Sequence, residues 1–180
     1  FPVPDNEHST LNRINSIIST IPQLESPDNL IDGDTGTVCL FRRAAGSKEI
    51  IIDIQSKDSF AARSLLLYPA NTPFAADIDL MINLNGKYKS IKKFRYDRSN
   101  ARINVGPIPK GPVAVSIPEV NSKNFRLIMS NFSLSNYLTN LPNNASDAAL
   151  SEIVLSGSPR VESFIEKQLG KMCQTPFPLW

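Results

Sequence analysis

The segment Asp77–Tyr96, DIDLMINLNGKYKSIKKFRY, decides the fold that we expect for this chain. Its first half alternates apolar and more polar residues, the period-2 pattern of a strand with one buried face, with the apolar positions at Ile78, Leu80, Ile82 and Leu84. The dipeptide Asn85-Gly86 follows, and both residues tolerate the positive φ of a type I′ turn. The chain then returns through Tyr88 and Ile91 towards Phe94 and Tyr96. This segment predicts a β-hairpin.

Further short strands are expected on both sides of the hairpin. Turn residues, including 14 prolines, interrupt the chain too often for long helices. The patterns predict strands at Glu49–Gln55, Arg63–Tyr68, Pro112–Ile117, Asn124–Ser130 and Leu150–Ser156. No helical stretches separate these strands, which argues against a parallel sheet. The sequence predicts an all-β fold, a two-layer antiparallel β-sandwich of about seven or eight strands.

Helix is expected only at the two ends. Residues Ser9–Ile21 and Ser163–Met172 place apolar side chains at helical spacing. We expect residues 1–28 to be a leader with a short helix and 29–157 to be the sandwich domain. Residues 158–180 are then a helical exit segment, whose apolar, proline-rich end is expected to connect to a further domain.

Composition excludes several classes of protein. The net charge is +2, with 41% hydrophobic and 20% charged residues, as in an ordinary globular domain. No apolar run approaches the roughly 20 residues that a membrane-spanning helix needs. The two cysteines, Cys39 and Cys173, form no metal-binding pattern. They are either one long-loop disulfide or two buried thiols, and the size of the core favours thiols.

Catalytic motifs are missing from the sequence. The single histidine, His8, lies in the expected leader, so neither a serine nor a cysteine nucleophile has an obvious base. No phosphate-binding loop is present. We expect no catalytic residues in this chain.

A basic run with interleaved aromatic residues lies between Lys87 and Arg102. Such a pattern suits a groove for single-stranded nucleic acid. The alternative is a solvated hairpin face whose lysines discourage edge pairing, with the aromatic residues in the core. The low net charge favours this alternative, and we expect no nucleic-acid partner.

The segment from Asp32 to Thr37, DGDTGT, is rich in oxygen ligands. Hard cations such as calcium prefer carboxylate and carbonyl oxygens, although the spacing is not that of an EF-hand. A plain Asx-rich turn is the alternative.

The same loop resembles the D-G-D-x-x-T loop of discoidin-like, galactose-binding-like domains, which include coagulation-factor C domains and many carbohydrate-binding modules. Four further segments in the expected order resemble strands of that family: 50–54 (IIIDI), 82–88 (INLNGKY), 124–128 (NFRLI) and 150–155 (LSEIVL). The resemblance covers residues 29–157 and implies a jelly roll. It also implies a structural Ca²⁺ held by Asp34, Thr37 and Glu152, with Asp32 shaping the turn.

The exit segment, 156–168, resembles the end of the sugar-binding-like domain of large α-L-rhamnosidase-type glycoside hydrolases. Sugar-binding modules stack a pyranose on an exposed aromatic ring and hold its hydroxyls with polar side chains. The loop residues expected to do so are Phe41, Arg42, Arg43, Asn71 and Phe74.

These expectations together favour a non-catalytic carbohydrate-binding or scaffolding module of a larger, secreted or periplasmic glycoside hydrolase. Its partners would be a glycan or the other domains of the parent enzyme, and the module itself would be a monomer. The alternative is an adhesion module that binds a protein or lipid surface through exposed Phe41 and Phe74. A nucleic-acid-binding domain that uses residues 87–102 is a further, weaker alternative.

Overall fold

The expected hairpin is present in the computed structural model, which describes residues 10–41, 48–99, 111–134 and 148–167. Strands β4 (Phe74–Leu84) and β5 (Lys87–Asp97) pair antiparallel and are joined at Asn85 and Gly86. These two residues have φ of 54° and 84°, the left-handed values that a type I′ turn requires. The side chain of Asn83 accepts a hydrogen bond from the Gly86 N–H at 2.9 Å and closes the turn.

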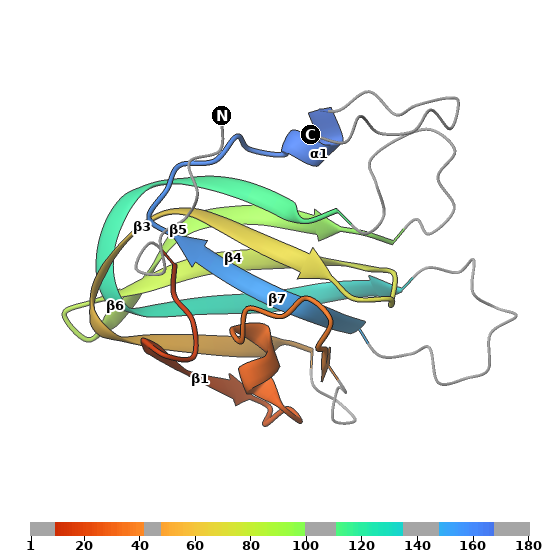
Figure 1. Ribbon diagram of the computed structural model, residues 1–180, viewed down its shortest axis with the longest axis horizontal. Coiled ribbons are helices and arrows are strands. Elements are labelled where there is room, and N and C mark those ends of the chain that lie inside the picture. The colour runs from red at the N-terminus through yellow and green to blue at the C-terminus, as the bar shows by residue number, and fades with distance from the viewer. Residues whose placement is uncertain (1–9, 42–47, 100–110, 135–147, 168–180) are drawn as a thin grey trace, which may run out of the picture.

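Two long strands connect the layers of the sandwich. The expected strands at 49–55 and 63–68 are parts of one strand, β3 (Ile50–Pro69), and those at 112–117 and 124–130 are parts of β6 (Val113–Leu134). β3 and β6 pair antiparallel along their lengths, with register shifts between Gln55 and Phe60 and between Ala62 and Ser64. Bulges of this kind bend a strand and increase its twist. The two strands curve together around one end of the molecule (Figure 1).

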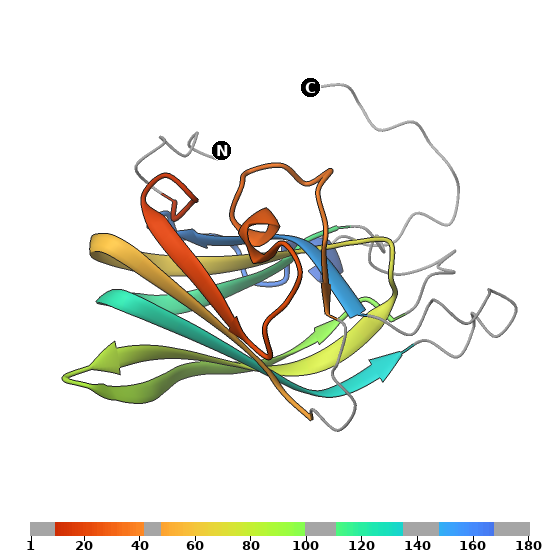
Figure 2. The same cartoon turned by 90° about the horizontal axis from the view of Figure 1, so that it is seen from below.

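We call the two sides of this bend the front and back layers. The front layer contains β1 (Ser16–Ile21), the first part of β3, the second part of β6, and the β4–β5 hairpin. The back layer contains β2 (Cys39–Phe41), β7 (Ala148–Ser156), the second part of β3 and the first part of β6. Figure 2 shows the green hairpin on one side of the sandwich and the blue β7 on the other. The antiparallel β-sandwich fold is confirmed.

The core lies between the layers because alternate residues of each strand point inward. In β4 the buried residues Ile78, Leu80 and Ile82 alternate with half-buried ones, as the sequence pattern predicts. The largest fully buried side chains are aromatic: Tyr96, Phe41, Phe74 and Phe125.

The helix expected at Ser9–Ile21 is wrong, and residues 16–21 of the expected leader belong to the sheet. Residues Ser16–Ile21 form β1, which pairs antiparallel with β3 from Ser16 opposite Ser56 to Ile21 opposite Ile51. Ile18 is buried, whereas Ile17 and Ile21 are exposed, so the burial has the period of a strand. The isoleucines have helical spacing, but β-branched residues also favour strands. Pairing with β3 stabilises the strand here.

Helical structure within the described residues is confined to two short pieces. A 3₁₀ turn, η1 (Pro27–Leu30), precedes the acidic loop, and α1 (Phe164–Lys167) lies within the expected Ser163–Met172 helix. The remainder of that expected helix and the apolar tail lie outside the described residues. Among the described helices, none is long and apolar enough to cross a membrane.

Candidate functional site

The acidic loop is organised by its own side chains. The carboxylate of Asp32 accepts hydrogen bonds from the Asp34 N–H at 2.8 Å and from the Thr37 hydroxyl at 2.9 Å. Asp34 in turn accepts a hydrogen bond from the Gly36 N–H at 2.8 Å. Gly33, with φ of 82°, provides the left-handed residue at the bend. These contacts are those of an Asx-rich turn.

Glu152 of β7 meets this loop, as the resemblance implies. Its carboxylate is buried, with 4% of the residue exposed, and accepts a hydrogen bond from the Gly33 N–H at 3.2 Å. Burial raises the pKa of Glu152 to about 7, the Gly33 hydrogen bond opposes this rise, and the nearby carboxylates of Asp32 and Asp34 add to it. The structure therefore brings Asp32, Asp34, Thr37 and Glu152 into one region.

The donor chemistry of this region fits a hard cation, because all the donors are oxygens and one carboxylate is buried. The arrangement is not that of a formed metal centre. Both oxygens of Asp32 accept hydrogen bonds from the loop itself. Among the described residues, no three His, Cys, Asp or Glu side chains are grouped as metal ligands would be.

The aromatic residues expected to stack against a ligand lie in the core, so this expectation is wrong for Phe41 and Phe74. Their exposed fractions are 1% and 0%. Phe74 stacks on Tyr96 with the ring centroids 4.6 Å apart. Phe41 packs edge-on against Phe74, with 6.3 Å between the centroids. A ring packed in this way offers no face to a sugar or a lipid. Alternation along β2 and β4 turns both rings inward.

Of the other expected ligand residues, Asn71 is exposed between β3 and β4, while Arg42 and Arg43 lie outside the described residues. Cys39 is a free, buried thiol, as expected, and burial raises its pKa to about 11. Cys173 lies outside the described residues.

Three cations of the basic hairpin have carboxylate partners. Lys92 pairs with Glu162 at 2.9 Å, Lys93 with Asp79 at 3.5 Å and Arg95 with Asp77 at 2.8 Å. Tyr96 is fully buried and Phe94 half-buried against the core. These three cations already have anionic partners, and these two rings pack towards the core, which makes them less available to a phosphate backbone and its bases. Arg102 lies outside the described residues.

Sequence reasoning missed a groove on the outer face of the front layer. It has a volume of about 550 Å³, and its lining comes from β4, β5, β6 and the residue before β3: Glu49, Asp77, Ile78, Asp79, Lys93, Phe94, Ile128 and Ser130. These residues are separated by up to 81 positions (49 to 130) in the sequence. Only the strand register brings them together, so no local pattern could have identified them.

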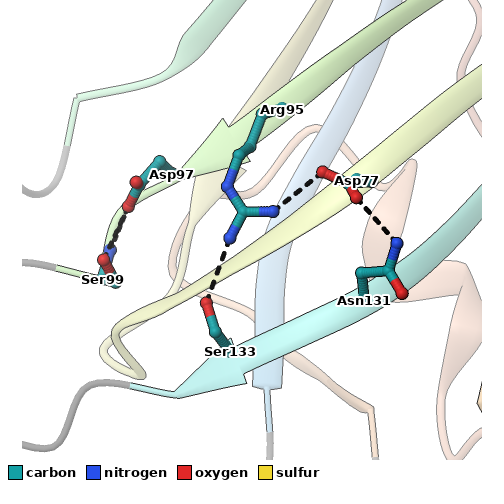
Figure 3. A network of polar contacts seen from close by, with 6 residues as sticks. All are labelled: Asp77, Arg95, Asp97, Ser99, Asn131 and Ser133. Carbon is teal, nitrogen blue, oxygen red and sulfur yellow. Dashed lines mark hydrogen bonds and ion pairs between the residues drawn. The ribbon is translucent and has the colours of Figure 1, made fainter.

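Asp77 is the centre of a polar network at this groove (Figure 3). Its two oxygens accept hydrogen bonds from Arg95 and Asn131, both at 2.8 Å, and Arg95 also donates to Ser133 at 3.2 Å. The Asn131 and Arg95 hydrogen bonds hold the pKa of the Asp77 carboxyl below its usual value. Asn131 has φ of 49° and lies in a bulge of β6. The bulge thereby directs its amide towards Asp77.

A second bulge lies on the other neighbour of β4. The pairs Leu80–Lys92 and Met81–Ser90 leave Ile91 as an extra residue in β5. Beside this bulge, Ser90 donates a hydrogen bond to Asp79 at 2.5 Å. Both outward carboxylates of β4 are thus held by side chains of the adjoining strands.

A third polar cluster continues across the same layer. Arg126 forms a bidentate pair with Asp53 at 2.7 and 2.8 Å, and its guanidinium carbon lies 3.8 Å from the centroid of the Tyr88 ring. The Asp53 hydrogen bonds raise the pKa of Arg126 further. The side chains of Asp53 and Arg126 are 22% and 25% exposed. Tyr88, the hairpin aromatic, thus packs on a cation of the outer face.

Comparisons with known proteins show that this fold is similar to that of solved carbohydrate-binding modules. The CBM32-3 module of a family 31 glycoside hydrolase from Clostridium perfringens aligns with a TM-score of 0.61 at 15% identity, over 88% of this chain and 100% of that one. The family 32 carbohydrate-binding module of C. perfringens NanJ, solved with galactose, gives 0.58 at 11% identity, over 82% and 97%. A pectin-binding module gives 0.55 at 14% identity, over 79% and 91%. No family model and no curated protein matches the sequence.

Proposed function

We propose that this chain is a non-catalytic carbohydrate-binding module of a larger glycoside hydrolase. The observation that carries this proposal is the likeness of the sandwich to carbohydrate-binding modules over most of both chains. One such module was solved with galactose, and another comes from a family 31 glycoside hydrolase. The module would hold the parent enzyme on a glycan while other domains perform the hydrolysis.

For the parent we propose a secreted or periplasmic enzyme of the α-L-rhamnosidase type. The support is the exit segment after β7, which resembles the end of the corresponding domain in those enzymes and leads through Ser158 and Pro159 into α1. A module that had lost sugar binding would remain there as a brace between domains.

We propose further that the acidic loop takes a structural calcium ion, held by Asp34, Thr37 and Glu152, with Asp32 shaping the turn. Burial, and to a smaller degree the nearby carboxylates, raises the pKa of Glu152, and a bound cation would offset both effects. Glu152 would then hold the loop against β7, to which the Gly33 hydrogen bond already connects it. Ligands that bind only the folded state raise its melting temperature.

The experiment that tests these proposals is a glycan-array screen in calcium and in EDTA, with melting temperatures measured in both buffers. Binding to at least one glycan supports the carbohydrate-binding module, and a higher melting temperature in calcium, lost in Glu152→Gln, supports the metal site. If the chain binds no glycan on the array, the binding function is contradicted and only the role as a brace between domains remains. An unchanged melting temperature contradicts the calcium site.

The residues that the adhesion alternative requires are not exposed. It requires apolar side chains at exposed loop tips, and both Phe41 and Phe74 are buried.

A further inference from the structure

The groove on the front layer has the volume of a small-molecule site and lies on an outer face of the sandwich. Its volume of about 550 Å³ lies within the roughly 300–1,000 Å³ of small-molecule sites. It lies on the outer face of the sandwich, since Asp77 and Asp79 alternate along β4 with the buried Ile78 and Leu80. Two bulges, at Asn131 of β6 and Ile91 of β5, flank it on the strands that adjoin β4.

The polar side chains of the groove are held in place before any ligand arrives. Asp77 is fixed by Arg95 and Asn131, and Asp79 by Ser90 and Lys93. Arg95 and Lys93 carry further N–H groups beyond those used here, and carboxylate oxygens can accept more than one hydrogen bond. Preordered groups lose less side-chain entropy when they bind. Sugar hydroxyls, which both donate and accept, match this mixture of donors and acceptors.

The charges around the groove nearly balance. Glu49, Asp77 and Asp79 provide three carboxylates, and Lys93 and Arg95 provide two cations, each already paired with an aspartate. A surface of this kind has no excess positive potential with which to attract a polyanion, and a uronate would approach carboxylates of its own sign. The charge of the groove therefore suits a neutral ligand.

Apolar side chains extend the groove across the sheet. Ile128, in the lining, lies opposite Ile51 of β3, and Ile51 lies opposite Ile21 of β1, which is 60% exposed. On the other side Ile128 pairs with Asp79, and Asp79 with Lys93. This row crosses five neighbouring strands, a width of about 19 Å at the usual strand spacing. Isoleucine side chains offer contacts to the C–H faces of sugar rings, so the row fits several linked sugars.

We propose that this groove binds a neutral oligosaccharide lying across the strands of the front layer, with Asp77, Asp79, Lys93 and Arg95 as its polar contacts. The proposal rests on carbohydrate binding as the function of the chain and names the binding surface and the ligand class. It places the ligand on a sheet face rather than on the loop residues expected from the sequence.

The test compares groove variants with a matched surface control by isothermal titration calorimetry. Lys93→Ala removes a side chain that is 74% exposed and disturbs the fold least, while Asp77→Ala removes the centre of the network. Each is expected to raise the Kd by about tenfold, the cost of one charged hydrogen bond. Asp58→Asn, exposed on β3 at least seven residues from the end that borders the groove, is expected to leave the Kd unchanged.

The ligands are neutral oligosaccharides of galactose, glucose, mannose and N-acetylhexosamine, beside oligogalacturonate as the anionic probe. Binding of a neutral ligand should change less than about twofold when salt is raised, because no charge is screened. Wild-type affinity in folded Lys93→Ala and Asp77→Ala overturns the groove while the carbohydrate-binding function stands. So does binding to oligogalacturonate alone. Failure of the wild-type chain to bind any of these sugars, or any glycan on the array, overturns the function itself.

Discussion

Truncation of Phe74 decides whether this ring belongs to the core or to a ligand site. Phe74 has no exposed surface and contacts three rings: Tyr96 at 4.6 Å, Phe132 at 6.0 Å and Phe41 at 6.3 Å between centroids. Replacing a buried phenylalanine by alanine costs about 3–5 kcal/mol through lost burial and the cavity that remains. Because domains are stable by roughly 5–15 kcal/mol, Phe74→Ala is expected to lose a large part of the free energy of unfolding.

Phe74→Leu separates the two roles. It keeps most of the apolar volume but loses the ring pairs, each of which contributes about 0.5–1.5 kcal/mol beyond burial. We expect a stability between those of wild type and Phe74→Ala, with glycan affinity unchanged. Ile17→Ala, at a side chain 65% exposed, is the control and should change stability by less than about 0.5 kcal/mol.

The measurement is urea unfolding followed by circular dichroism, together with glycan titration of the folded variants. A loss below about 1 kcal/mol for Phe74→Ala would refute the burial argument. If Phe74→Leu has wild-type stability but no longer binds glycan, the Phe74 ring contacts the ligand rather than only the core.

Three further predictions follow from single residues. Because the pKa of Glu152 is raised to about 7 from 4.5, its ionised form destabilises the folded state, so the free energy of unfolding in calcium-free buffer should fall as pH rises from 5 to 8. Urea unfolding at both pH values measures this, and Glu152→Gln should remove most of the slope. Gly86→Ala places a side chain at φ of 84° and should cost about 1–2 kcal/mol in thermal or urea unfolding, whereas Lys87→Ala should not. Burial raises the pKa of Cys39 to about 11, so its thiol should react slowly with iodoacetamide at pH 8 in the folded Cys173→Ser variant and quickly after unfolding. Rapid labelling of the folded variant would contradict the burial of Cys39.

The hairpin was predictable because all its determinants are local. Alternation between Ile78 and Leu84 defines one strand, and Asn85-Gly86 defines the turn, so no distant residue is needed. The acidic loop is similar: its Asx contacts join residues at most five positions apart, and only the resemblance connects it with Glu152.

Strand β1 and the aromatic core could not be derived in that way. Ile14, Ile17, Ile18 and Ile21 have helical spacing, yet β1 is a strand because β3 offers a partner for its backbone. Phe41 and Phe74 were expected at loop tips, but each lies within a strand whose alternation turns its ring inward. Both errors arise because pairing and layer packing override local preference.

The acidic loop and the groove belong to different layers, which separates their roles. Glu152 lies on β7, where it pairs with Tyr68 in the second part of β3. The groove is lined by β4, β5 and the second part of β6 and opens away from the core. A cation at the loop would therefore contribute no charge or ligand to the groove, and its effect on a glycan would pass only through the stability of the sandwich. This arrangement implies that calcium raises the melting temperature but leaves the Kd for the glycan unchanged. The converse, affinity that changes with calcium at constant stability, would mean that the glycan contacts the loop rather than the sheet face.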